Sequence, residues 1–298
     1  MKLYYYKGVP NFGDHLNPWL WNKLLPGLEN DDRRFCLVGI GTLINERLPY
    51  FTRFSERRVI FGSGVGYGKG KTPTLDEFYK VYCVRGPLSA KALGLPEELG
   101  ITDGAALLRN VLPIGNSKKR YSYTYMPHHE NASVAWEKAC QDIGFGYIDP
   151  RGSLEEALQT ISETEMMIAE AMHGAIIADA FRIPWIPIVS NSESVLSFKW
   201  NDWCGSLGLP YEPNFIERLY HPRDVKDILT PARKVRDYVR YKRAAQELKK
   251  VAMTCRPFLS SDDRINDLTE RLTEKLEEFK ADLHRDPFFE GYQPAVKL

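Results

Sequence analysis

Residues 169–180 read AEAMHGAIIADA, and this stretch decides which fold the sequence can adopt. It follows a short apolar run at residues 166–168 and precedes another at residues 185–189. Because glycine permits a tight turn and small residues predominate after it, we expect a strand, a turn, a helix over residues 175–181 and a second strand. A strand–helix–strand unit of this kind builds a parallel sheet that is covered by helices.

The first half of the chain repeats the pattern of apolar strands that end in glycine. Residues 35–41, 59–66 and 80–86 each read as an apolar run that closes on a glycine. Continuous apolar strands are typical of a parallel sheet that is buried on both faces. A further strand opens the chain and leads into a helix over residues 15–25, for which Asp14 is the expected N-cap.

A change in the residue pattern near residues 113–120 divides the chain into two α/β parts. Residues 113–120 combine turn residues with a charge run, and a new series of strands and helices begins after them. We therefore expect an α/β protein of two Rossmann-like, doubly wound domains, residues 1–116 and 117–225. Two long, charged segments with helical periodicity predict a C-terminal helical extension over residues 226–298.

Composition excludes several classes of function. The 298 residues carry a net charge of +1, so bulk electrostatics gives no reason to expect a nucleic-acid partner. No run approaches the ~20 apolar residues that span a bilayer, and the N-terminus lacks the pattern of a signal peptide. Five cysteines without a CxxC pair argue against a zinc site and a disulfide framework. We expect a cytoplasmic protein with reduced thiols and no metal.

His173 is the strongest candidate for chemistry. It lies between a strand end and a helix whose first N–H groups and partial positive charge favour anions. An imidazole there can donate a proton or bind a phosphate or carboxylate, and Gly174 would let the backbone approach the ligand. The alternative is a histidine that only caps the helix. Glu170 beside it could act as a base toward a hydroxyl.

Other polar residues stand where further strands end. Arg85 suits bidentate binding of a carboxylate or phosphate, or else an ion pair between the domains. Asp103 is either an N-cap or a base. His128 and His129 follow another strand. Because adjacent side chains point apart in a strand, we favour polar contacts to a ligand over a metal site for these two.

Three further segments contribute candidates. The loop with Asn11, Gly13 and Asp14 is either a capped turn or a binding loop ahead of the first helix. Ser63 lies in a glycine turn and is a further cleft candidate. Lys199 lies in a segment with two tryptophans, which either stack on a sugar or anchor the last helices to the core.

The sequence resembles the polysaccharide pyruvyl transferase family in a set of motifs and in their order. They are N-x-G-D at 11–14, the Gly-x-Gly strand ends, V-R-G-P-L-S at 84–89, D-G at 103–104 and M-H-G at 172–174. The resemblance covers roughly residues 1–205 and is closest to short bacterial members linked to acidic exopolysaccharides.

The resemblance implies a GT-B-like transferase with its active site in the cleft between two domains. Such enzymes move the enolpyruvyl unit of phosphoenolpyruvate onto a sugar as a cyclic pyruvate ketal. The acceptor would be a sugar of an exopolysaccharide or of its lipid-linked precursor. Phosphoenolpyruvate would be the donor substrate, and no cofactor is implied.

The family's donor-binding motifs can be placed residue by residue. Its V-R-x-x-x-S motif falls on Arg85 and Ser89, and the His-Gly of its S-x-R-x-H-G motif falls on His173 and Gly174. We expect His173 to act as the general acid toward the donor, with Asp14 as the base toward the sugar hydroxyl.

Two family residues are replaced in this chain. Ala171 stands at the position of the family arginine, and Ala169 at that of the serine. The missing positive charge would then come from Arg85, Lys199 or a histidine of the pair at 128–129.

Alternatives stay open at this stage. One is a nucleotide-sugar glycosyltransferase of the same two-lobed architecture, and another is a non-catalytic relative. The basic cluster within residues 233–243 is a solvated face, packs across both halves, or makes a peripheral contact with the inner surface of the cytoplasmic membrane.

Overall fold

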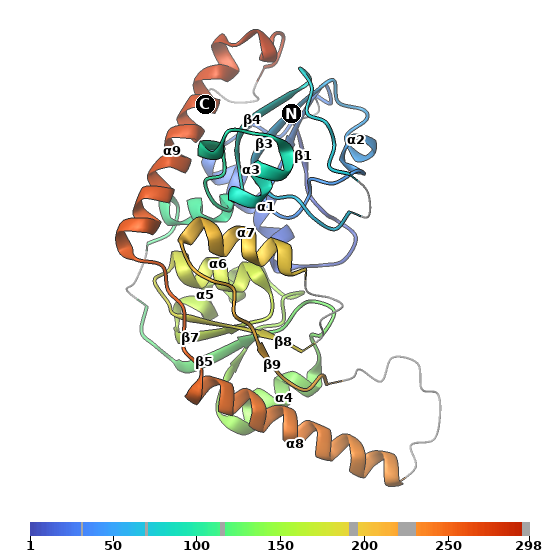
Figure 1. Cartoon of the computed structure of the whole chain (residues 1–298), viewed down its shortest axis with the longest axis vertical. Coiled ribbons are helices and arrows are strands. Elements are labelled where there is room, and N and C mark those ends of the chain that lie inside the picture. The colour runs from blue at the N-terminus through green and yellow to red at the C-terminus, as the bar shows by residue number, and fades with distance from the viewer. Residues whose placement is uncertain (31, 69–70, 114–116, 191–195, 220–230, 294–298) are drawn as a thin grey trace.

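The protein forms two α/β lobes, each built on a parallel sheet (Figure 1). A computed structural model describes residues 1–30, 32–68, 71–113, 117–190, 196–219 and 231–293, with the backbone alone over 231–237. The two lobes and their parallel sheets confirm the predicted fold class. The expected domain borders at 116/117 and 225/226 lie at or inside segments outside the described residues.

The first lobe holds a four-stranded sheet in the order β1-β2-β3-β4. Its strands are Lys2–Tyr4, Phe35–Val38, Arg57–Ser63 and Tyr79–Val84. Its helices are α1 (Phe12–Leu24), α2 (Leu48–Phe51) and α3 (Pro87–Leu93), with 3-10 turns η1 (Glu97–Leu99) and η2 (Gly104–Asn110).

The second lobe holds a five-stranded sheet in the order β6-β5-β7-β8-β9. Its strands are β5 (Tyr121–Met126), β6 (Gly146–Tyr147), β7 (Thr164–Ala169), β8 (Trp185–Val189) and β9 (Asn214–Phe215). Its helices are α4 (Val134–Ile143), α5 (Leu154–Ser162), α6 (Met172–Ala180) and α7 (Ser197–Leu207). The strand order reverses at β5, which has β6 on one side and β7 on the other.

Helix α1 begins earlier than the sequence predicted. The side chain of Asn11 accepts a hydrogen bond from the N–H of Gly13 at 3.1 Å, so Asn11 is the N-cap. The prediction that Asp14 caps this helix is therefore wrong, because Asn11 already satisfies the first free N–H group. Asp14 lies in the first turn of the helix instead.

Helix α6 also begins earlier, at Met172 rather than at residue 175. The helix continues through Gly174, because its other residues are small or apolar and all but one of them are buried against the sheet. His173 consequently lies in the first helical turn. The N-cap position is Ala171, which offers no side-chain hydrogen bond to this turn.

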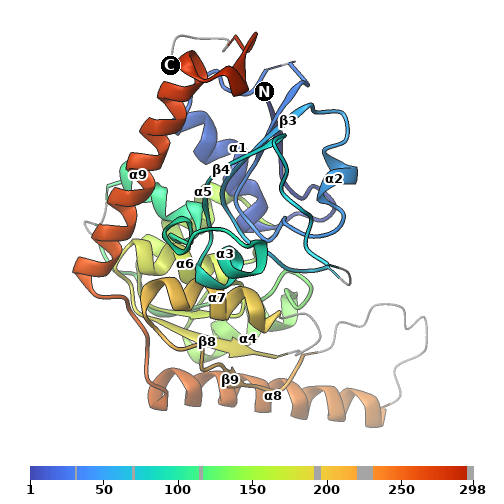
Figure 2. The ribbon, with the colours of Figure 1, turned by 45° about the horizontal axis from the view of Figure 1, so that its top comes forward.

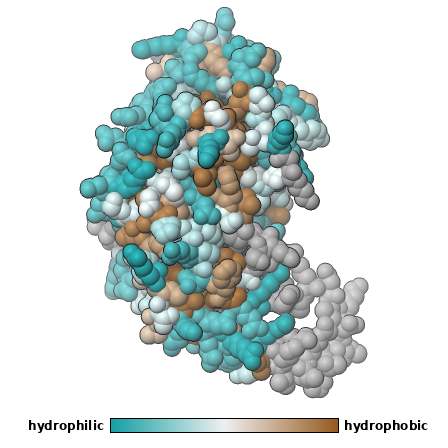
Figure 3. All heavy atoms as spheres, viewed as in Figure 1, coloured by the Kyte–Doolittle hydropathy of each residue, from teal (hydrophilic) through white to brown (hydrophobic). Residues whose placement is uncertain are grey.

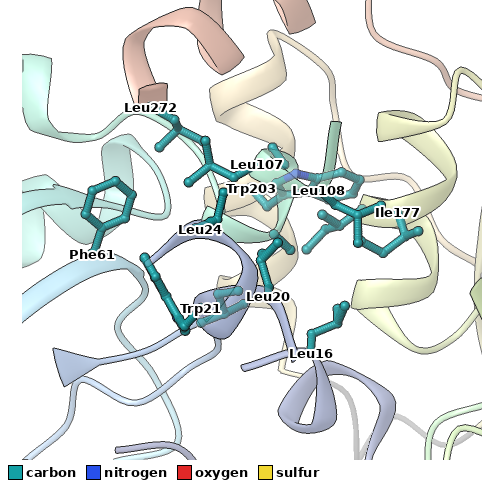
Figure 4. Close-up of a cluster of buried hydrophobic side chains, with 14 of the residues drawn as sticks. Leu16, Leu20, Trp21, Leu24, Phe61, Leu107, Leu108, Ile177, Trp203 and Leu272 are labelled. Atoms are coloured by element: carbon teal, nitrogen blue, oxygen red, sulfur yellow. The ribbon is translucent and has the colours of Figure 1, made fainter. Parts of the chain in front are cut away.

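One apolar core joins the two lobes (Figure 4). It combines side chains of α1, β3 and η2 from the first lobe with α6 and α7 from the second and with a C-terminal helix. Leu16, Leu107 and Ile177 are fully buried within it. Because a large apolar contact restricts domain motion, the strand ends of both lobes are held in a fixed relation.

The tryptophans of α7 belong to this packing. Trp200 has no exposed surface and Trp203 is 2% exposed. Trp200 stacks on Tyr211 with ring centroids 5.0 Å apart, and Trp203 lies 5.0 Å from Trp185. Of the two interpretations that the sequence left open, anchoring in the core therefore holds rather than stacking on a sugar.

The C-terminal extension divides between the lobes (Figures 1 and 2). Helix α8 (Pro231–Thr254) packs on α4 of the second lobe through Ala244 and Leu248. Helix α9 (Asp262–Arg285) crosses back to the first lobe, where the hydroxyl of Tyr82 donates to Asp282 at 2.7 Å, and the chain continues into η3 (Pro287–Phe289).

The outer surface is mostly hydrophilic. On the face shown in Figure 3, hydrophilic residues cover the exposed side of α9 at the left edge, and apolar residues are interspersed elsewhere. An amphipathic helix on a water-exposed surface gives this pattern. Among the helices described here, none combines the length and apolar character needed to cross a membrane.

Candidate active site

Loops at the carboxyl ends of both sheets bring candidate residues together around the start of α6. The first turn of α1 carries Asp14, the first turn of α6 carries His173, and η2 follows Asp103. Helix α1 and turn η2 both pack directly on α6. The second-lobe loops leave the sheet where its strand order reverses, which is the usual ligand position in open α/β sheets.

His173 lies between the two lobes. Its Nδ1 edge lies over Gly13, where a Cβ atom would be 2.0 Å from Nδ1. Its Nε2 is buried without a hydrogen-bond partner, 3.8 Å from Oδ2 of Asp103. Burial, together with the positive charges of Lys199 and Arg85, lowers the pKa of this imidazole to about 3. The ring is therefore neutral at physiological pH.

Asp103 is fully buried behind His173. Its Oδ1 caps η2 by accepting the N–H of Ala105 at 3.0 Å, as the N-cap alternative predicted. Its Oδ2 has no hydrogen-bond partner. Burial raises the pKa of this carboxyl to about 7, although the Ala105 N–H and the charge of Arg85 oppose the rise. Near neutral pH the group can therefore hold or release a proton.

Asp14 is the second buried carboxyl of the site, with 9% of its surface exposed. Burial raises its pKa to about 7, while the positive charge of Lys199 and a hydrogen bond from Asn11 oppose the rise. A carboxyl whose pKa lies near neutrality can accept a proton from a hydroxyl and still be ionised part of the time.

Lys199 supplies positive charge next to Asp14 and to the histidines of the site. It lies on α7, is 7% exposed, and its Nζ contacts the hydroxyl of Tyr67 at 2.5 Å. Its charge lowers the pKa of His173, His128 and His129 and opposes the rise at Asp14. A single buried ammonium therefore faces acid–base groups from both lobes.

His128 and His129 lie next to each other in the loop after β5. Their ring centroids are 4.3 Å apart, so the expectation that they point apart is wrong, because the strand has already ended at Met126. Burial lowers the pKa of His128 to about 2, and its Nδ1 has no hydrogen-bond partner. Across the described ranges, no three histidine, cysteine or acidic side chains gather as metal ligands.

Glu170 organises the sheet edge. Its carboxylate accepts hydrogen bonds from the N–H of His128 at 3.0 Å, from the amide of Asn131 at 3.0 Å, and from the N–H and hydroxyl of Ser190 at 2.7 and 2.8 Å. Both oxygens are engaged and the residue is fully buried. Glu170 thus ties together the loops after β5, β7 and β8, and no oxygen is left over for a ligand.

Arg85 forms a buried ion pair between the lobes, as the alternative for this residue predicted. Its Nε donates to Asp202 of α7 at 3.0 Å, Nη1 to Thr42 at 2.7 Å, and Nη2 to the carbonyl of Val65 at 3.0 Å. The hydroxyl of Ser89 donates to the same Asp202 carboxylate at 2.5 Å. Neither the Arg85 nor the Ser89 side chain has exposed surface through which a ligand could reach it. Donor binding by these two residues stays a prediction.

Two other candidates, Gly174 and Ser63, make contacts within their own lobes. Gly174 lies against the sheet, where a Cβ atom would come within 2.8 Å of the sulfur of Met126, so the glycine permits close helix–sheet packing. The hydroxyl of Ser63 donates to the carbonyl of Gly41 at 3.1 Å inside the first lobe. Their roles toward a ligand stay predictions.

We expect Gly13→Ala to separate activity from stability. Alanine favours the helix by roughly 0.5–1 kcal/mol, so the melting temperature should not fall. The added Cβ would overlap the His173 ring and push it aside, and a displacement of about 1 Å can lower turnover about 10²-fold. Steady-state kinetics and thermal unfolding test this.

Gly205→Ala is the matched control for that variant. Gly205 lies in α7, and an added Cβ there meets only the ring of Pro87 at 3.4 Å. We expect its activity to stay within about twofold. Normal turnover of Gly13→Ala would show that the position of the His173 ring does not matter.

Sequence reasoning missed two neighbours of the site, Asp202 and Tyr67. Asp202 follows Lys199 by three residues on one helix, a spacing that places both on the same face, so the sequence carried a usable signal. Tyr67 has a positive φ of 57° in the loop after β3, and no residue pattern indicated that this loop reaches α7.

Two α/β lobes thus bring a buried ammonium, an imidazole and two carboxyls together at one site. A model of the polysaccharide pyruvyl transferase family matches residues 11–192, more than half of the chain. The chain belongs to this family and is a transferase. It is 42% identical over 216 residues to the succinoglycan biosynthesis protein ExoV of Rhizobium meliloti (strain 1021), covering 72% of this chain and 67% of that protein.

Family membership decides between the alternatives that the sequence left open. The activity of the family is pyruvyl transfer onto a polysaccharide, as its description states. The interpretations as a nucleotide-sugar glycosyltransferase and as a non-catalytic relative are therefore set aside.

Proposed function

We propose that the enzyme transfers the pyruvyl group of phosphoenolpyruvate onto a sugar and closes it as a cyclic ketal across two hydroxyls. The acceptor is a sugar of an exopolysaccharide or of its lipid-linked precursor, in keeping with the succinoglycan biosynthesis named for the relative. The observation that carries the proposal is the buried Lys199 ammonium of the second lobe, whose charge acts on His173 of the same lobe and on Asp14 of the first lobe. A small anion that needs protonation suits this combination.

The donor is held by Lys199 rather than by Arg85 in this proposal. Each of the three guanidinium nitrogens of Arg85 already donates to the protein, whereas Lys199 contacts only the hydroxyl and ring of Tyr67 among the described residues. The first turn of α6, which has no side-chain cap, adds partial positive charge near the donor. His128 contributes a contact to the donor through Nδ1, which has no hydrogen-bond partner in the protein. This assigns Lys199 to the charge lost at Ala171.

The chemistry uses one acid and one base. His173 delivers a proton to the methylene carbon of the donor, and the double-bond electrons form the new C–H bond. A sugar hydroxyl then attacks the central carbon while Asp14 takes its proton. Phosphate leaves with the electrons of its C–O bond, and the second hydroxyl closes the ketal while its proton passes to the departing phosphate. No cofactor besides the donor enters these steps.

The acceptor determines where the enzyme works. A lipid-linked acceptor calls for a cytoplasmic enzyme that contacts the inner membrane surface peripherally, without nucleic acid as a partner. Of the basic cluster on α8, Arg240 lies 3.6 Å from Glu217 and Lys242 lies 3.6 Å from Asp142. Acidic neighbours thus offset these two cations, which favours a solvated face for this part of the helix.

Phosphate release tests the proposed function. The full-length enzyme is incubated with phosphoenolpyruvate and candidate oligosaccharides, and inorganic phosphate is measured together with the mass of the sugar product. We expect release that requires the sugar and a product with one added pyruvyl group. Release that requires a nucleotide sugar instead, with no mass shift by a pyruvyl group, would overturn the proposal.

A further inference from the structure

Two buried polar atoms face each other without hydrogen bonds behind the candidate site. They are Oδ2 of Asp103 and Nε2 of His173, 3.8 Å apart. Leaving such atoms unpaired destabilises the folded protein, so proteins rarely keep them without a use. The two residues come from different lobes, and the shared core holds them in this position.

Capping does not explain why position 103 is an aspartate. The cap of η2 uses only Oδ1, which accepts the Ala105 N–H at 3.0 Å. Asparagine or serine would cap equally well without burying a second acidic oxygen. The spare Oδ2 therefore calls for a role of its own, and within the described ranges the ion-pair contact of this oxygen is with His173.

The opposite edge of the His173 ring is the one that can meet a ligand. The side chain is 14% exposed, whereas Nε2 itself is buried, so the exposed part of the ring lies away from Asp103. The Nδ1 edge lies against Gly13, whose missing Cβ makes room for the ring itself. The imidazole thus has Nε2 toward a carboxyl, while the exposed part of the side chain lies away from Nε2.

We propose that Asp103 is a positioning residue that acts through His173, holding the Nε2 edge of the ring and passing it a proton. This inference rests on the proposed function. As Nδ1–H goes to the methylene carbon of the donor, the carboxyl of Asp103 gives its proton to Nε2. The ring stays neutral with its proton now on Nε2, and Asp103 becomes a carboxylate. Before the next turnover Nδ1 takes up a proton from solvent and the Nε2 proton returns to Asp103.

This arrangement lets His173 deliver a proton without becoming positively charged. A ring flanked by Lys199 and Arg85 resists becoming an imidazolium, and the burial-lowered pKa of His173 reflects this. A proton supplied at Nε2 while another leaves at Nδ1 avoids the charged ring altogether. Asp103 can hold that proton near neutrality, because burial raises its pKa; Arg85, Asp202 and Cys83 are the other titratable groups around it.

The proposal predicts a bell-shaped pH profile for kcat/KM with its two limbs on two residues. Turnover falls as pH rises through about 7, because Asp103 loses the proton that it must supply. Turnover also falls as pH drops through about 7, because Asp14 must be ionised to act as base. The groups that face Asp14 are Lys199, Asn11 and Tyr4.

Asp103→Asn tests the proposal, since asparagine keeps the cap but carries no proton to give. We expect kcat to fall on the order of 10²-fold, binding of phosphoenolpyruvate to change less than threefold, and the falling limb of the pH profile to disappear while the rising limb remains. Turnover within threefold of the parent, or an unchanged falling limb, would overturn the proposal.

Asp76→Asn is the matched control. Asp76 is exposed and accepts the N–H of Phe78 at 3.1 Å, the same two-residue capping geometry as at Asp103, but far from the site in the loop before β4. Its rate and pH profile should equal those of the parent. An equal loss in both variants would mean that removal of a capping carboxylate alone explains the effect.

A second readout does not depend on turnover. In protein labelled with ¹⁵N-histidine, the ring nitrogens of His173 report protonation directly, and His173→Gln assigns their signals. We expect these signals to respond to the titration near pH 7 in the parent and not in Asp103→Asn. If the His173 signals change near pH 7 but no sugar-dependent phosphate release is found, only the proposed function is contradicted. If these signals do not change near pH 7 in the parent, the Asp103 proposal is overturned.

Discussion

His173→Ala is expected to lower turnover about 10²–10⁴-fold without unfolding the protein. A positioned acid contributes a factor of this size, and the three atoms nearest to a Cβ at Gly13 all belong to the His173 ring. The side chain is partly exposed and its Nε2 has no hydrogen-bond partner, so little folding energy is lost with it. Phosphate release at saturating donor and thermal unfolding give the two measurements.

His284→Ala provides the control for this loss. His284 lies on the exposed face of α9, away from the strand ends, so its removal should leave the rate unchanged. Imidazole added to His173→Ala should restore part of the activity, because it can enter the space left by the ring. If His173→Ala keeps more than a third of the parental rate, His173 is not the acid.

Asp202→Ala is expected to lower the free energy of unfolding by about 3–5 kcal/mol, which is a large part of the stability of an ordinary domain. The change leaves the guanidinium of Arg85 buried without its counter-charge, since neither residue has exposed surface. It also removes the acceptor for the N–H of Ser89 at 2.9 Å. Unfolding in urea, followed by tryptophan fluorescence, measures the loss.

The double variant Arg85→Met/Asp202→Ala separates two contributions to this stability loss, the unpaired charge of Arg85 and the volume of the removed side chain. Removal of both charges should recover part of the loss, because most of the cost is an unpaired buried cation. Asn201→Ala, on the exposed side of the same helix, should change stability by less than about 0.5 kcal/mol. A loss below 1 kcal/mol in Asp202→Ala would show that the pair does not join the lobes.

Local patterns were sufficient for the elements of the fold. Apolar runs that end in glycine predicted β2, β3 and β4, and they were found in one parallel sheet. The charged periodic segments after residue 230 became α8 and α9. The starts of α1 and α6 were predicted three residues late, because Asn11 and Gly174 both read as turn residues. Such signals depend only on neighbours within a few residues.

The contacts within the site could not be predicted from such local patterns. Asp103 and His173 were both candidates, but nothing in either segment indicated that their side chains face each other. The partner of Arg85 lies 117 residues away in the sequence, and that of Tyr82 lies 200 residues away on α9. Pairs of this kind depend on how two lobes pack, which no local period encodes.

The sequence by itself determined two parallel α/β units, a histidine at the start of a helix, and a resemblance to one family of transferases. Only the tertiary structure decided that Arg85 is used within the protein, that Lys199 is the cation facing the acid–base groups, and that Asp103 lies behind the imidazole. The reason is physical: hydrophobic periodicity and capping act along the chain, whereas burial, pKa and charge pairing depend on which distant segments exclude water together.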